Sequence, residues 1–135
     1  MQIALLLIFG SYLSYTDLTR HIIGNRTLLI FFSAILVLHL LARTLTESLA
    51  FFFKAAMVIL LLQWLTGALL GMGDAKYLAV LALLIGRSDF YFRGLAFVAL
   101  YACISGLLLF AWRHSLTAPV PLAPAISAGF ISALL

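Results

Sequence analysis

Charged residues are scarce in this 135-residue sequence: they make up 9% of the chain, against about 25% in a typical soluble domain. Hydrophobic residues make up 66%. A chain of this composition cannot cover itself with a polar surface, which excludes an ordinary soluble protein and predicts a lipid bilayer as the solvent. The eight Lys and Arg residues are scattered along the chain, so nucleic-acid binding has no support.

Cysteine and histidine are also rare. Cys103 is the only cysteine, which excludes an intrachain disulfide and a zinc site built from cysteines. It lies in an apolar stretch, so we expect a buried thiol that packs as a small hydrophobic side chain. The three histidines are far apart in the sequence and lack the spacing of metal ligands. No metal site is therefore predicted.

Long apolar runs dominate the rest of the chain, and each is bounded by charged residues or prolines. A straight helix needs about 20 apolar residues to cross a bilayer core. The pattern predicts an all-α, polytopic membrane protein, a bundle of about six transmembrane helices in a single domain, 1–135. Three prolines crowd the start of the last run and predict a regular helix only from about Pro124. The six runs cover residues 1–16, 23–42, 48–70, 75–86, 90–112 and 120–135.

The order of the four acidic residues along these runs is informative. Asp17 follows the first run and Asp74 follows the third, so two predicted crossings separate them and place both at one membrane face. Glu47 and Asp89 fall at the other face by the same count. The basic residues divide equally between the two faces, so the charge bias does not orient the protein.

Two carboxylates at one membrane face have a chemical use. Acids near the hydrocarbon boundary are costly unless paired or hydrated, and a close pair can share one proton. Such a pair can activate water with one group and protonate a leaving amine with the other. The alternative is a pair of structural ion pairs, Asp17 with Arg20 or His21 and Asp74 with Lys76. The spacing alone leaves both interpretations open.

Two short motifs accompany the aspartates. Residues 71–74 read Gly-Met-Gly-Asp, a G-x-G-D motif, and residues 23–25, which follow Asp17 at six to eight positions, read Ile-Gly-Asn. This pairing resembles the type IV prepilin peptidases, a family of G-x-G-D intramembrane aspartic peptidases, and most resembles its short, peptidase-only form that serves Flp-type, tight-adherence pili. Gly24 departs from the family, which usually has proline there. The proline-rich segment 121–124, with Gly129 beyond it, also resembles the family.

The resemblance implies a function. It implies that Asp17 and Asp74 are the catalytic pair of a multi-pass protein of the bacterial inner membrane and that they face the cytoplasm. The implied partner is a pilin-like precursor, with a short basic leader before the scissile bond and a hydrophobic helix after it. No metal and no cofactor are implied. The enzyme would be an aspartic endopeptidase.

Other residues are candidates for shaping the site. Gly71 and Gly73 either allow a substrate backbone to approach Asp74 or pack helices together. The positive charge of Lys76 either stabilises the ionised form of Asp74 or extends to the lipid headgroups. Asn25 either shapes the first loop and meets substrate or caps a helix.

Two rival functions stay open. The first is a preflagellin or other intramembrane aspartic peptidase, with the same chemistry on a different substrate. The second is a non-enzymatic transporter or scaffold subunit in which the aspartates handle ions or bind partners. Transporters usually place such acids near the middle of the membrane, whereas these acids are predicted near one boundary.

Overall fold

The computed structural model describes residues 1–20, 23–66, 71–113 and 122–135, and this part of the chain folds into α-helices. Within these ranges there are six helices and no strand, as the sequence predicts. The helices are α1 (Gln2–Arg20), α2 (Asn25–Leu41), α3 (Leu45–Thr66), α4 (Met72–Ile85), α5 (Ser88–Arg113) and α6 (Ala123–Leu134).

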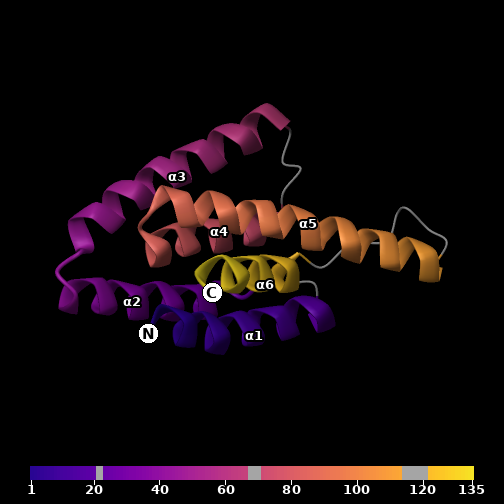
Figure 1. The fold of residues 1–135 in the computed structure, drawn as a ribbon, viewed down its shortest axis with the longest axis horizontal. Helices are drawn as coiled ribbons and strands as arrows, with labels where there is room; N and C mark the ends of the chain where they lie inside the picture. Colours follow the sequence, from indigo (N-terminus) through magenta and orange to yellow (C-terminus); the bar gives the residue numbers. More distant parts are fainter. Residues whose placement is uncertain (21–22, 67–70, 114–121) are drawn as a thin grey trace.

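The helices run back and forth between two ends of the molecule (Figure 1). The α2–α3 and α4–α5 connections lie on the left of the view, whereas the last turn of α1 and the start of α6 lie farther to the right. α3 diverges from the other helices, whereas α6 packs closely against both α1 and α5. This arrangement brings the end of α1 and the start of α6 together.

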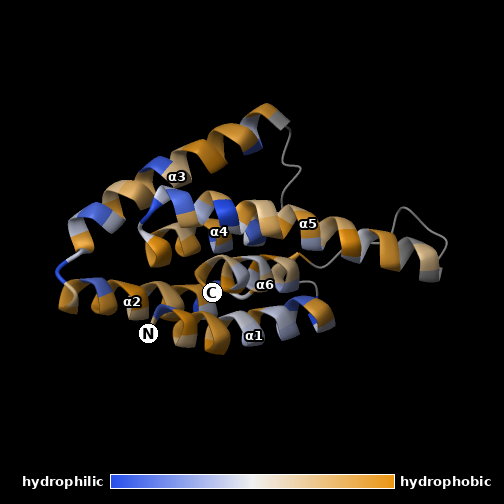
Figure 2. Cartoon of the chain, in the orientation of Figure 1, coloured by the Kyte–Doolittle hydropathy of each residue, from blue (hydrophilic) through white to orange (hydrophobic). Residues whose placement is uncertain are grey.

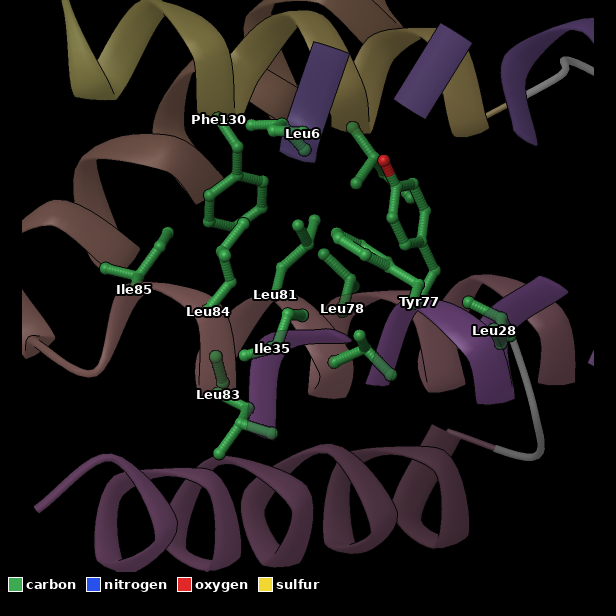
Figure 3. Packing of buried hydrophobic residues seen from close by; sticks show 14 of the residues in the cluster. Leu6, Leu28, Ile35, Tyr77, Leu78, Leu81, Leu83, Leu84, Ile85 and Phe130 are labelled. Carbon is green, nitrogen blue, oxygen red and sulfur yellow. The ribbon is translucent and has the colours of Figure 1, made fainter. Parts of the chain in front are cut away.

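α4 forms the core of the bundle. It contacts α2, α3, α5 and α6, and its residues from Leu81 to Ile85 are all buried. Figure 3 shows its side chains pointing toward several helices. A helix that is apolar on all sides is typical of a buried element, and α4 can be short because protein surrounds it. α4 ends at Gly86, whose φ of 63° is the left-handed conformation that glycine adopts readily at a helix end.

The outer helices expose apolar side chains. α3 and α5 are long and apolar enough to cross a bilayer over Leu45–Leu65 and Ser88–Leu108, and only 6% and 11% of the residues in the most apolar windows are buried. Figure 2 shows hydrophobic residues over most of these two helices. Apolar surface of this extent is unfavourable in water and favourable in lipid. The fold is that of a membrane protein.

Cys103 lies on this outer surface and is exposed, so the prediction of a buried thiol is wrong. The reason is physical: a side chain that faces lipid and one that faces the protein core are equally apolar. The local sequence around Cys103 does not distinguish the two.

The helix boundaries correct the sequence prediction at both aspartates. α1 continues through Asp17 to Arg20, although its apolar run ends at residue 16. α4 begins at Met72, so the G-x-G-D motif forms the first turn of the helix instead of preceding it. α6 begins as predicted, with Pro124 in its first turn, where its missing N–H costs nothing. The predicted helical residues 67–70 and 120–121 lie outside the described residues.

A buried histidine joins two helices at the end far from the aspartates. His39 of α2 is 4% exposed, and its Nδ1 lies 2.8 Å from Thr44 Oγ1 and 3.1 Å from Ser48 Oγ. Ser48 belongs to α3. His39 therefore has a structural role in fixing the α2–α3 turn.

Candidate functional site

Asp17 is buried at the contact between α1 and α6. Its side chain is 7% exposed, and the Ala123 N–H donates a hydrogen bond to Asp17 Oδ2 over 3.0 Å. Ala123 is the first residue of α6, where backbone N–H groups have no partner within the helix and attract negative charge. Leu122 at the N-cap position makes no side-chain cap, so Asp17 caps α6 from another helix.

Asp74 lies in the first turn of α4, just before the apolar part of that helix. Its carboxyl is half-buried, and Oδ1 is buried without a hydrogen-bond partner among the described residues. Burial, and to a smaller extent the negative charge of Asp17, raises the pKa of Asp74 from its ordinary value of 3.8 to about 6. The two carboxyls therefore lie close enough to influence each other, as the sequence predicts.

The two sequence motifs pack against each other. A Cβ on Gly73 would lie 3.0 Å from the Cβ of Ile23, which begins the Ile-Gly-Asn segment. A Cβ on Gly71 would lie 3.0 Å from Asp74 Oδ2. Gly73 thus packs the two motifs together, whereas a side chain on Gly71 would lie against the Asp74 carboxylate.

Gly24 has the backbone conformation that the family's proline would impose. Its φ is −69° and its ψ is 123°, and proline fixes φ near −65°. A Cβ there would meet only Thr27 Oγ1, at 3.5 Å. Gly24 therefore has a backbone conformation that proline could also adopt.

Asn25 and Lys76 contact each other instead of the carboxylates. Lys76 Nζ donates to Asn25 Oδ1 over 3.2 Å, at an exposed position between α2 and α4. The two residues form the polar end of a surface groove of about 250 Å³ whose other walls are apolar. Lys76 therefore ties the motifs together beside the pair of aspartates.

The ion pairs of the alternative interpretation are absent from the described part of the chain. No described residue forms an ion pair with Asp17 or Asp74, and Lys76 is engaged with Asn25. His21, the other proposed partner of Asp17, lies outside the described residues. Within the described ranges, no group of three or more His, Cys, Asp or Glu side chains could hold a metal ion.

Three hydroxyl groups meet next to the aspartates, and sequence reasoning missed this contact. Ser127 Oγ of α6 lies 2.8 Å from Tyr77 Oη of α4 and 3.2 Å from Ser14 Oγ of α1. Tyr77 is fully buried and points from α4 toward α6 (Figure 3). The only signal in the sequence is that Ser14 and Tyr77 each lie three residues from an aspartate.

Comparison with known proteins identifies a family that matches this sequence. The model of the type IV leader peptidase family matches residues 4–111, which include both aspartates and both motifs and end before α6. No curated protein and no solved structure matches the chain. Because the match covers most of the sequence, the chain belongs to the type IV leader peptidase family.

Proposed function

We propose that this protein is an aspartic endopeptidase that removes the basic leader from pilin-like precursors at the cytoplasmic face of the bacterial inner membrane. Asp17 and Asp74 are the catalytic residues. One observation carries the proposal: the two motif segments pack together, Ile23 against Gly73, with both carboxyls beside this contact. Family membership supports the peptidase activity, while the substrate and the membrane are parts of the proposal.

The surroundings of the two carboxyls suggest different roles. The Ala123 N–H at the start of α6 donates a hydrogen bond to Asp17, whereas burial raises the pKa of Asp74 and favours its neutral form. Asp74 therefore carries the shared proton, and Asp17 acts as the base that activates water.

The reaction then follows in two steps. Asp17 removes a proton from water as the water oxygen bonds to the scissile carbonyl carbon, and Asp74 donates its proton to the carbonyl oxygen. The tetrahedral diol collapses when Asp17 passes its proton to the leaving nitrogen and the C–N bond breaks. A diol proton returns to Asp74, so the pair ends as it began.

The position of the pair favours a peptidase over a transporter. Asp17 lies in the last turn of α1 and Asp74 in the first turn of α4, so both are near helix ends. A precursor whose scissile bond precedes an apolar helix would present that bond at this level. Ion sites of transporters lie near the middle of the membrane instead.

The test of this function is cleavage by the purified protein alone. The protein is reconstituted in lipid vesicles with a pilin-like precursor or a preflagellin, and the products are identified by mass spectrometry. We expect leader release from the pilin-like precursor and a free amine at the new N-terminus. If the preflagellin is cleaved faster, the proposed substrate is wrong and the protein is a preflagellin peptidase. If neither precursor is cleaved, the proposed function is overturned.

A topological prediction follows from five crossings. Single cysteines at Thr19 and Met72, introduced after Cys103→Ser, should react with a membrane-impermeant reagent from the same side. Cysteines at Glu47 and Arg87 should react from the other side, and all four native side chains are exposed. Labelling of positions 19 and 72 from opposite sides would contradict the paired-aspartate model.

A stability prediction follows from the raised pKa of Asp74. Below its ordinary value of 3.8, Asp74 is neutral in the folded and the unfolded protein. As the pH rises from there to about 6, Asp74 ionises in the unfolded chain before it ionises in the folded protein. The free energy of unfolding therefore falls over this pH range. Asp74→Asn should therefore raise the melting temperature at a pH of about 8 and leave it unchanged below a pH of about 4. Thermal unfolding in detergent measures both, and an equal shift at both pH values would refute the prediction.

A further inference from the structure

We infer that Ser14, Tyr77 and Ser127 form a hydroxyl cluster that positions the two catalytic aspartates relative to each other. The inference rests on the proposed function and adds three positioning residues to it. None of the three is assigned a chemical step.

The cluster connects the three helices that build the site. Ser127 Oγ of α6 is 2.8 Å from Tyr77 Oη of α4 and 3.2 Å from Ser14 Oγ of α1. Ser127 also lies within hydrogen-bonding distance of two carbonyl oxygens, 2.8 Å from that of Ala123 and 3.3 Å from that of Gly10. A single serine of α6 is therefore bonded to α1, to α4 and to its own helix.

Either partner of each hydroxyl–hydroxyl contact can donate, and one arrangement of the hydrogens lets Ser127 bond to both other hydroxyls and to a carbonyl oxygen. A serine hydroxyl has one hydrogen to donate and two lone pairs that accept. In this arrangement Ser127 donates to one of the carbonyl oxygens, which only accept, and its own oxygen accepts from Tyr77 and Ser14. The Tyr77 hydroxyl is then a donor whose partner is Ser127, and its removal leaves Ser127 without that bond.

Each member of the cluster lies one helical turn from a group of the site. Ser14 precedes Asp17 by three residues, Tyr77 follows Asp74 by three, and Ser127 follows Ala123 by four. Residues three or four apart lie on the same face of a helix. The cluster therefore lies beneath the two carboxyls and fixes the spacing of the helices that carry them.

The packing around the cluster is too close to allow independent movement. A Cβ on Gly10 would lie 3.0 Å from Ser127 Oγ and 3.3 Å from Tyr77 Oη. Hydroxyls this deep in an apolar bundle are costly unless they are hydrogen-bonded, and apolar side chains could fill the same space. The benefit of the hydroxyls is a defined distance between α1, α4 and α6.

The test compares two tyrosines that each lose one buried hydroxyl. Tyr77→Phe removes the bond to Ser127, and the control Tyr91→Phe removes a bond of 3.1 Å from Tyr91 to the Leu78 carbonyl oxygen, which is not part of the hydroxyl cluster. We expect Tyr77→Phe to lower kcat by about 10- to 100-fold with KM nearly unchanged, because a small misplacement of catalytic groups has effects of this size. Its pH–rate profile should also shift, while Tyr91→Phe keeps the wild-type kcat and profile.

The outcomes separate this inference from the proposed function. Cleavage by the wild-type protein is measured first and tests the proposed function by itself. If the wild type cleaves and Tyr77→Phe matches Tyr91→Phe in kcat and pH profile, the positioning role is refuted. Should Tyr77→Phe fail to fold, Ser14→Ala replaces it, since Ser14 is only partly buried, and the same comparison with Tyr91→Phe decides.

Discussion

Asp17→Asn and Asp74→Asn are each expected to abolish leader cleavage while the protein still inserts and accumulates. A positioned acid or base contributes about 10² to 10⁴-fold to a rate, and this reaction needs both. Asparagine keeps the shape of aspartate and an oxygen that can accept the Ala123 N–H, but it cannot exchange a proton. The measurement is the initial rate of leader release by each purified variant.

Two other acids serve as matched controls. Glu47 and Asp89 are exposed, and they lie in the first turns of α3 and α5, at the opposite end of the bundle. Glu47→Gln and Asp89→Asn should cleave at the wild-type rate. A wild-type rate in Asp17→Asn or Asp74→Asn would refute the catalytic assignment and favour a partner-binding role for the aspartates.

The second large effect concerns the seam between α5 and α6. A Cβ on Gly129 would lie 2.7 Å from the backbone nitrogen of Val98, and one on Gly94 would collide with the Phe130 ring. Gly129→Ala should therefore force the helices apart and lower the free energy of unfolding by about 1–3 kcal/mol. Since α6 also carries Ala123, cleavage should fall as well. Thermal unfolding and the cleavage rate measure the two effects.

Gly106→Ala is the control for this substitution. Gly106 belongs to α5, the helix that Gly129 of α6 packs against, and a Cβ there would meet nothing within 4 Å. Alanine also favours a helix over glycine, so this variant should be as stable as the wild type or slightly more stable. Equal stability of Gly129→Ala and Gly106→Ala would show that α5 and α6 are not in close contact at Gly129.

The sequence predicts the number of helices and the pairing of the aspartates because both depend on coarse features. Long apolar runs separated by charges define the helices, and counting the runs places Asp17 and Asp74 at one end of the bundle. The G-x-G-D motif adds the chemistry. These inferences need no knowledge of which helix faces which.

The remaining features depend on tertiary contacts that apolar helices do not encode locally. α1 continues past its apolar run because Asp17 has a partner in α6, more than a hundred residues away. The contact of Tyr77 with Ser127 likewise joins distant helices. Lipid and protein core favour the same side chains, so the exposed Cys103 could not be distinguished from a buried one.

The most direct measurement is a double-mutant comparison of the two aspartates. Initial rates are recorded for the wild type, Asp17→Asn, Asp74→Asn and the double variant, with enzyme in excess over a labelled pilin-like precursor. Substitutions of groups that act as a unit have non-additive effects on the rate. The cleavage rate of the double variant should therefore be about as low as that of each single variant. If the two losses multiply in the double variant, or if either single variant cleaves at the wild-type rate, Asp17 and Asp74 are not a catalytic pair.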